Sequence, residues 1–243
     1  MIKEIKSRQN ELIKEVAKLS DASYRKEIKK FKVDGFHMFE MAKSSNRLLE
    51  VFTLKEIKDL DDSVTQYLVS EEVLEKISSS KSPQGIVSVC KFNDENEIKS
   101  ERVLYLDGVS DPGNLGTILR TALAFSFNDV ILSKKCCSIY NEKALQASQG
   151  AILNLNIVDD KKLLELKKSG YSILATEIKG SLSLKDVSKN NKIVLVLGNE
   201  AHGVSESILK LADKRIRIDI QNIESLNVAI AGAIAMYELS KNK

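Results

Sequence analysis

The stretch Val103-Leu-Tyr-Leu-Asp-Gly-Val-Ser-Asp-Pro-Gly-Asn-Leu-Gly-Thr-Ile-Leu-Arg-Thr-Ala122 decides the fold, because it joins three local signals. The apolar run at residues 103–106 predicts a buried strand, which stops at Asp107-Gly108. Asn114 then predicts the start of a helix as its cap, and that helix carries Arg120 on its second turn. A strand, a turn of glycine and proline and a capped helix in that order are typical of a ligand-facing edge in an α/β domain.

The chain continues with regular alternation after this stretch. Strands are predicted at residues 103–106, 130–132, 153–158, 172–175 and 193–197. Helix-length segments lie at residues 114–125, 142–149 and 161–168. This alternation predicts a largely parallel sheet with helices on both faces. Residues 215–220 alternate polar and apolar, so one side of that strand should face water.

The first part of the chain reads as a separate, smaller α/β domain. Helices are predicted at residues 11–19 and 71–77, the second capped by Ser70, and strands at residues 50–54 and 84–90. Residues 93–102 are polar, charged and nearly free of apolar side chains, which is typical of a linker. We therefore expect a first domain at residues 1–92, a linker at 93–102 and a second domain at 103–243.

Composition is that of an ordinary soluble globular chain of 243 residues, with 43% hydrophobic and 29% charged residues. No apolar window approaches the ~18 residues of a membrane span, and the charged N-terminus has no signal-peptide core. The three cysteines, Cys90, Cys136 and Cys137, fit no metal-ligand spacing. These features predict a cytoplasmic protein with no metal site and no membrane partner.

The charge is uneven along the chain, although the formal net charge is only +3. Residues 1–32 contain ten Lys and Arg and five acidic residues, a net charge of +5. A basic N-terminal end suggests a polyanion partner such as RNA. The alternative is a solvated helix face, because lysine and glutamate are interspersed there.

Three corners of the second domain carry the candidate catalytic and binding residues. They are residues 107–120, 196–203 and 218–227. In a parallel sheet, the loops after the strands gather at one edge, where ligands bind. The glycines of the first corner do not have the dinucleotide-binding spacing, and the chain has no GK[ST] phosphate loop. Taken singly, each polar residue has a structural alternative: a cap for Asn114 or Ser225, and a surface position for Arg120 or His202.

Taken together, these corners resemble the three ordered motifs of the SpoU (TrmH) RNA ribose methyltransferases. The matching stretches are Asp111-Pro-Gly-Asn-Leu-Gly-Thr-Ile-Leu-Arg-Thr-Ala122, Leu197-Gly-Asn-Glu-Ala-His-Gly-Val204 and Glu224-Ser-Leu-Asn-Val-Ala-Ile-Ala231. The match covers about residues 103–240. The first domain resembles the ribosomal-protein-L30e-like substrate-binding domain of this family, through Phe31, Asp34-Gly35, Glu40-Met-Ala42 and Ser82-Pro-Gln-Gly85.

The resemblance implies an α/β catalytic domain of the SPOUT class with a C-terminal trefoil knot, a rare exception to the rule against knotted chains. It implies S-adenosylmethionine as cofactor, and a homodimer with the site near the interface. The helix expected at residues 226–239, rich in alanine and apolar nearly all round, would suit that interface. The implied reaction is methylation of a ribose 2′-hydroxyl, in 23S rRNA if the first domain reads rRNA. The alternatives are a tRNA substrate, or a non-catalytic RNA-binding factor with the same fold.

The resemblance also assigns roles to residues. The implied catalytic residues are Asn114, Arg120, Glu200, Ser225 and Asn227. The implied cofactor-binding residues are Thr176, Gly180, Leu197, Gly198, Asn199, Ile218, Ile220 and Leu226. One departure concerns Ile218, which precedes Asp219 where the family usually has proline. The stretch up to Glu224 is one residue short and lacks glycine, so altered loop geometry is expected there.

Two roles are open for Arg120. With help from a phosphate or a neighbouring group, a desolvated arginine could accept the hydroxyl proton. Alternatively, Arg120 stays charged, holds an RNA phosphate and stabilises the developing alkoxide. The second role is favoured because it needs little change in the pKa of the side chain. The pKa of an arginine exceeds ~12, which makes it a poor base.

Overall fold

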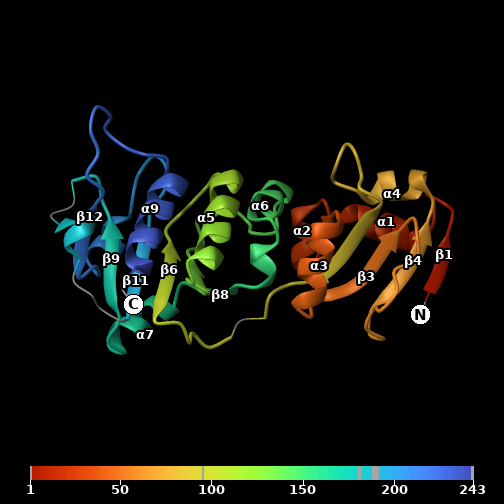
Figure 1. Ribbon diagram of the computed structural model, residues 1–243, viewed down its shortest axis with the longest axis horizontal. Helices are drawn as coiled ribbons and strands as arrows, with labels where there is room; N and C mark the ends of the chain where they lie inside the picture. The colour runs from red at the N-terminus through yellow and green to blue at the C-terminus, as the bar shows by residue number, and fades with distance from the viewer. Residues whose placement is uncertain (1, 95, 180–181, 188–191, 242–243) are drawn as a thin grey trace. The chain divides into compact units, whose positions relative to one another are not determined.

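The computed structural model describes residues 2–94, 96–179, 182–187 and 192–241, which form two compact units (Figure 1). The first unit contains the chain up to Asn93 together with Tyr140–Leu153. The second contains Asp94–Ile139 and the chain from Asn154 onward. The segment Tyr140–Leu153, which the sequence placed in the second domain, therefore packs with the first unit. Its Tyr140 ring stacks on Phe92 with ring centroids 3.7 Å apart.

The first unit is built on a five-stranded sheet. Its strands lie in the order β1 (Ile2–Ile5), β4 (Thr65–Val69), β3 (Leu48–Thr53), β5 (Ile86–Lys91) and β2 (Lys30–Asp34). Strands β1, β4 and β3 are parallel to one another, and β5 runs antiparallel to both of its neighbours, β3 and β2. Helices α1 (Glu11–Lys18) and α4 (Glu71–Ile77) share a hydrophobic cluster with β3, β4 and β5, and α2 (Ala22–Ile28) adds partly buried residues to it. Helix α3 (Phe36–Ser44) packs against β2, β3 and β5, while α6 (Glu142–Ser148) and the 3-10 turn η1 (Ala151–Leu153) complete the unit.

Buried charge explains why the sequence did not predict β2. Lys32 lies in the middle of this strand and is 4% exposed, so the strand lacks the apolar run that would mark it. Its ammonium donates to the carbonyl of Ile77 over 2.8 Å. Helix α4 has the predicted bounds, and Ser70 stands at its N-cap position. The Ser70 side chain makes no capping bond; its carbonyl accepts from the N–H groups of Val73 and Leu74.

The second unit confirms the predicted α/β class with a parallel sheet. Its seven strands lie in the order β10 (Leu182–Ser183), β12 (Lys214–Arg217), β9 (Ser172–Thr176), β11 (Ile193–Leu197), β6 (Arg102–Leu106), β7 (Asp129–Leu132) and β8 (Asn156–Asp159). Every neighbouring pair among them is parallel. The predicted strand at residues 153–158 is in fact the end of η1 followed by β8, and the one at 215–220 is the shorter β12.

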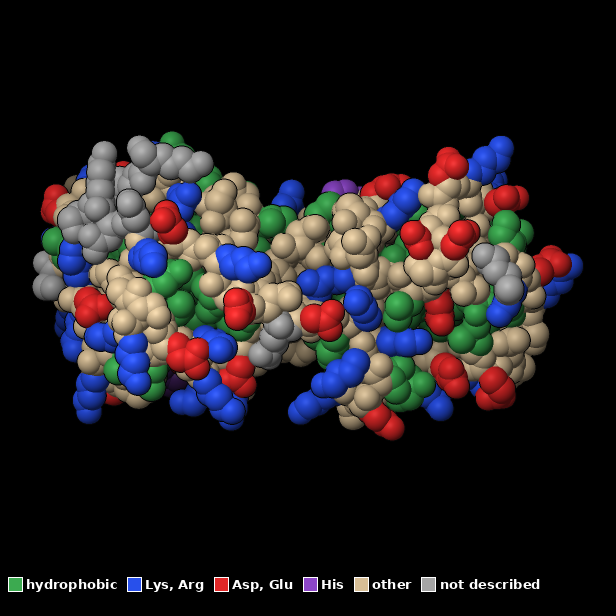
Figure 2. Space-filling view, turned by 90° about the horizontal axis from the view of Figure 1, so that it is seen from below, with side chains coloured by type: hydrophobic (Ala, Val, Ile, Leu, Met, Phe, Trp, Pro, Cys, Tyr) green, Lys and Arg blue, Asp and Glu red, His purple; other side chains and the backbone are tan. Residues whose placement is uncertain are grey.

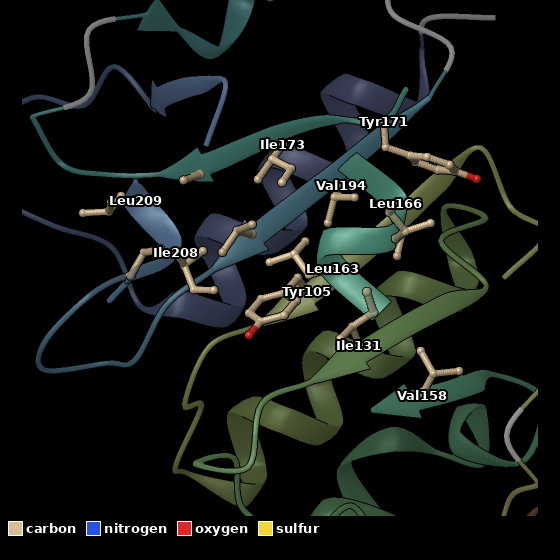
Figure 3. Packing of buried hydrophobic residues seen from close by; sticks show 14 residues of the cluster. Tyr105, Ile131, Val158, Leu163, Leu166, Tyr171, Ile173, Val194, Ile208 and Leu209 are labelled. Atoms are coloured by element: carbon tan, nitrogen blue, oxygen red, sulfur yellow. The ribbon is translucent and has the colours of Figure 1, made fainter. Parts of the chain in front are cut away.

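Helices cover both faces of this sheet. On one face, α7 (Lys162–Lys168) and α8 (Glu206–Leu209) pack on a cluster that includes Val194 and Val196 of β11 (Figure 3). Leu197 alternates with these valines and meets Gly232 of α9 (Val228–Ser240), so α9 lies on the other face. Helix α5 (Pro112–Ala124) packs against α9.

The polar segment at 93–102, predicted as a linker, is tied to the second unit over much of its length. The backbone N–H groups of Lys99 and Ser100 donate to the Asp129 carboxylate over 3.2 and 2.7 Å. The Asn156 amide bonds the carbonyl of Asn96 over 3.2 Å, and Arg102 already belongs to β6. Within the residues that the structure describes, no helix is long and apolar enough to span a membrane.

Candidate functional site

The carboxyl ends of the adjacent strands β12, β9, β11 and β6 place the three predicted corners along one edge of the sheet. Asp107 follows β6 directly and fastens two of them together. Its N–H donates to the carbonyl of Leu197 over 2.8 Å, and its carboxylate accepts from the N–H of Ser205 over 2.7 Å. Asp107 is 6% exposed, so its role is to hold the loops, not to meet a ligand.

Helix α5 begins earlier than the sequence predicted. Asp111 is its N-cap, accepting from the N–H of Asn114 over 2.8 Å, and Pro112 is its first residue. The prediction of Asn114 as the cap is therefore wrong. The Asp-Pro pair is a recognised start signal and would have located the helix correctly. Because Asn114 is not needed as a cap, its side chain is available to join the other two corners.

Glu200, in the loop after β11, is the acceptor at the centre of the site. Its carboxylate accepts from the Asn114 amide over 3.1 Å, the Ser110 N–H and hydroxyl over 3.1 and 2.9 Å, and the Asp111 N–H over 3.1 Å. Partial burial works to raise the pKa of Glu200, but these hydrogen bonds outweigh it and lower the pKa to about 2. The group is thus a carboxylate at neutral pH. Ser110 and Asp111 were not among the predicted site residues.

Asn227 closes the arrangement from the third corner. Its amide nitrogen donates to the side-chain oxygen of Asn114 over 3.0 Å. Its own oxygen accepts from the N–H groups of Ala229 and Ile230 over 2.8 and 3.3 Å, so Asn227 caps α9. The helix therefore starts at Val228, and the alternative role of Ser225 as its cap is excluded. Ser225 is exposed and makes no hydrogen bond with the described residues.

Arg120 lies on α5 and is exposed, away from the buried stripe of the helix, as predicted. It makes no hydrogen bond or ion pair with any residue in the described part of the chain. The hydroxyl of Thr117, on the same helix, donates to the carbonyl of Gly113. The guanidinium, which can donate five hydrogen bonds, is thus free to meet an anion.

The loop after β11 has a shape that only glycine permits at its first residue. A Cβ at Gly198 would lie 2.2 Å from the carbonyl carbon of Gly203, because Asn199 and Gly203 pair their backbones over 2.9 Å in both directions. The Asn199 side chain bonds the carbonyl of Gly108 over 2.8 Å and the N–H of Ala201 over 2.9 Å. Asn199 therefore shapes the loop, and Leu197 is fully buried against α9, so neither presents its side chain to a cofactor.

The remaining predicted cofactor residues flank the ends of β9 and β12. Thr176 donates its hydroxyl to the carbonyl of Val196 over 2.9 Å. The half-buried residues Ile218, Ile220 and Leu226 follow β12. Ile178 and Ile223 leave 66% and 58% of their surface uncovered in the same two loops. Uncovered apolar side chains at the carboxyl edge of a parallel sheet suit the adenine ring of a nucleoside cofactor. Gly180 lies outside the described residues.

Asp219 explains how the chain manages without the family's proline. Its carboxylate accepts from the Ser183 hydroxyl and, over 3.0 Å, from the Arg217 guanidinium. The bond from Ser183 is the main cause that lowers the pKa of Asp219. The side chain thus anchors the start of the segment after β12 to β10. A search of the described residues finds no group of three or more His, Cys, Asp or Glu side chains placed to hold a metal ion.

Comparison with protein families and solved structures agrees with this geometry. Residues 101–237 match the SpoU rRNA Methylase family, and residues 10–88 match the MRM3-like substrate binding domain. A structure titled as a putative RNA methyltransferase of the TrmH family from Porphyromonas gingivalis is 28% identical, with a TM-score of 0.84 over 95% of this chain and 97% of that one. An AdoMet-bound rRNA methyltransferase from Sinorhizobium meliloti has the same fold, with a TM-score of 0.86 and 24% identity over 99% and 98% of the chains.

These matches place the chain among the RNA methyltransferases. The chain belongs to the SpoU rRNA methylase family. Its similarity extends over the whole length of one Bacillus subtilis relative, the 23S rRNA (guanosine(2553)-2'-O)-methyltransferase RlmP, which is 30% identical over 98% of this chain and 99% of its own. An uncharacterized tRNA/rRNA methyltransferase of Synechocystis is also 30% identical, over 100% and 95%.

Proposed function

We propose that this enzyme transfers the methyl group of S-adenosylmethionine to a ribose 2′-hydroxyl of 23S rRNA. The observation that supports it most strongly is the chain of bonds from Glu200 through Asn114 to Asn227, with the exposed Arg120 on the same helix as Asn114. The RNA class follows from the Bacillus subtilis relative, whose name specifies 23S rRNA and the 2′-oxygen. The cofactor follows from the AdoMet-bound structure from Sinorhizobium meliloti.

The residues available at the carboxyl ends of β9, β11 and β12 fit this cofactor. Ile218, Ile220 and Leu226 offer apolar walls, and Gly198 allows the tight turn of the loop after β11. When bound, S-adenosylmethionine supplies an electrophilic methyl group on a sulfonium. The protein's task is therefore to prepare the oxygen nucleophile. The proposal includes the C-terminal trefoil knot that the resemblance implies.

Arg120 acts as the electrostatic element of the site. Its guanidinium binds an RNA phosphate and stabilises the negative charge that develops on the 2′-oxygen. Asn114 is a positioning residue whose amide orientation is fixed from both ends. Ionised Glu200 only accepts, so the Asn114 nitrogen must face it, and the Asn114 oxygen then accepts from Asn227.

The enzyme functions as a homodimer through α9. Ile230, Ile234 and Tyr237 stand at helical spacing along one face of this helix and are 52%, 38% and 50% exposed. A row of large apolar side chains in water is typical of an interface. Because Asn227 caps the same helix, association would also stabilise the third corner of the site. The protein would work in the cytoplasm, where rRNA is modified.

The test uses the purified protein, S-adenosylmethionine with a labelled methyl group, and rRNA and tRNA from cells that lack the gene. We expect label in 23S rRNA at a nucleotide that resists alkaline cleavage, as 2′-O-methylated RNA does. Label confined to tRNA would replace the proposed substrate by the tRNA alternative. Binding of RNA without calorimetric binding of S-adenosylmethionine would instead support a non-catalytic factor.

A further inference from the structure

Two short motifs of the first unit meet at one corner of its sheet, and the site described above does not use them. Asp34-Gly35 follows β2, and Ser82-Pro-Gln-Gly85 precedes β5. Because β5 runs antiparallel to both β2 and β3, its start lies beside the ends of those strands. The Gly35 N–H donates to the carbonyl of Ile86 over 3.1 Å, and the Leu54 N–H donates to that of Gly85 over 3.2 Å.

Both glycines of this corner have a left-handed backbone conformation. Gly35 has a φ of +91°, and a Cβ there would lie 2.6 Å from the side-chain oxygen of Gln84. Gly85 has a φ of +83°, and a Cβ there would lie 3.7 Å from a methyl group of Leu54. The positive φ values favour glycine at both positions, and at Gly35 the missing side chain also leaves room for the Gln84 amide.

The same corner exposes large apolar surface. Phe36, the first residue of α3, is 51% exposed, and Leu54 is 37% exposed. Gln84 is exposed beside them. An exposed phenylalanine next to an exposed amide provides a flat stacking surface and a group that can both donate and accept hydrogen bonds.

Two exposed lysines are close in sequence to the residues of this surface. Lys55 follows Leu54, and Lys81 precedes Ser82; both are exposed, and neither ammonium forms a hydrogen bond or ion pair within the described ranges. The Lys55 carbonyl accepts from the Thr53 hydroxyl over 2.9 Å. The nearest carboxylate of the motifs, Asp34, is already engaged by the Ser78 hydroxyl and by the Ser79 N–H over 3.2 Å. Elsewhere basic and acidic side chains are interspersed, as on the face in Figure 2, so charge alone does not mark an RNA surface.

We propose that this corner, made of Phe36, Leu54, Gln84, Lys55 and Lys81, binds an unpaired nucleotide of the RNA substrate. The base stacks on Phe36, the Gln84 amide bonds its edge, and the two lysines hold the flanking phosphates. Proteins read RNA sequence at unpaired bases because those bases can leave the stack and meet an aromatic ring. The inference rests on the proposed function, since it assumes an RNA substrate.

The test compares Phe36→Ala with Phe36→Trp in the full chain. We measure RNA affinity by fluorescence anisotropy on the 23S rRNA segment that becomes methylated, and KM and kcat for its methylation. Stacking of one base corresponds to about 1–3 kcal/mol, so Phe36→Ala should weaken RNA binding and raise KM by roughly 5- to 150-fold. Phe36→Trp should retain affinity, and neither change should alter S-adenosylmethionine affinity. Leu164→Ala, which removes a 54% exposed side chain in the second unit, is the matched control.

The lysines give an independent measurement. The logarithm of RNA affinity should fall less steeply with the logarithm of salt concentration in Lys55→Gln/Lys81→Gln, by about 1.4 for two single-strand phosphate contacts. Unchanged RNA affinity in Phe36→Ala overturns the proposal, and so does an equal loss in Phe36→Trp. If the wild type binds 23S rRNA fragments but methylates none, the proposed function fails, while the same anisotropy series on the fragment that binds still tests the corner.

Discussion

The amide of Asn114 donates to the carboxylate of Glu200 over 3.1 Å, although 86 residues separate them in the chain. This bond fixes which end of the amide faces Glu200, and thereby which end faces Asn227. The three motifs are thus connected by the geometry of a single side chain. Arg120 lies on the same helix as Asn114, so the orientation of α5 also sets the position of the guanidinium that the proposed function directs to the ribose.

Replacing Glu200 by glutamine should disturb this chain of bonds with little change in volume. The carboxamide can present only one oxygen to donors that now meet a carboxylate, so hydrogen bonds to a charged acceptor are lost. We expect Glu200→Gln to lower kcat by about tenfold or more, since each such bond contributes about 1.5–3 kcal/mol. Steady-state kinetics, with S-adenosylmethionine affinity from calorimetry, measures this; an unchanged kcat would contradict the positioning role.

The pKa of Glu200 predicts a specific pH dependence of stability. Because its pKa is lowered from 4.5 to about 2 in the folded protein, its ionised form stabilises the fold above pH 4.5. That contribution is lost as the pH falls from 4.5 towards 2. The difference in unfolding free energy between wild type and Glu200→Gln should therefore shrink from pH 7 to pH 3 in urea titrations. A constant difference would show that the carboxylate is not the cause.

Replacing Arg120 by alanine should abolish turnover and leave cofactor binding intact. Its guanidinium is exposed and forms no hydrogen bond or ion pair with a described residue, so we expect little loss of stability, while the developing charge loses its partner. We expect kcat to fall by about 10²-fold or more. Arg120→Lys should recover part of the rate, because it restores a charge without the planar fork. Methylation at the wild-type rate in Arg120→Ala would rule out both roles considered for this residue.

Three glycine-to-alanine changes should differ in a predictable order. Gly198→Ala places Cβ against backbone at 2.2 Å and should deform the loop, with loss of S-adenosylmethionine binding. Gly232→Ala meets a Leu197 methyl group at 2.6 Å and should cost about 1–3 kcal/mol, because a side chain can partly yield. Gly203→Ala meets nothing within 4 Å and should cost only about 1–2 kcal/mol for its positive φ. Chemical denaturation and calorimetry measure both effects; equal costs would contradict this order.

Replacing Ile230 by aspartate should convert the proposed dimer into a monomer. The residue is 52% exposed at the start of α9, where a charge would be desolvated on association. Sedimentation analysis should show half the mass of the wild type, while Leu164→Asp, at a similar exposure on α7, should not change it. A monomeric wild type would contradict the assignment of this face.

The sequence predicted the second unit well because its buried parallel strands are continuous apolar runs, as at Val194–Leu197 of β11. It missed β2, where a lysine occupies a buried position and is satisfied by a carbonyl from a distant helix. Within the site, the motifs identified Asn114, Glu200 and Asn227. The bonds among them could not be predicted, because they depend on which residue caps each helix.

The bonds that join the three corners of the site connect distant parts of the chain. Asp107 and Ser205 are 98 residues apart, and Asn114 and Asn227 are 113 apart. Contacts of such long sequence separation form late, because loop closure must precede them. On the ribosome, the strand and helix of the first motif emerge long before their partners. The nascent chain therefore cannot methylate RNA until its last helix has folded, and activity reports the completion of folding itself.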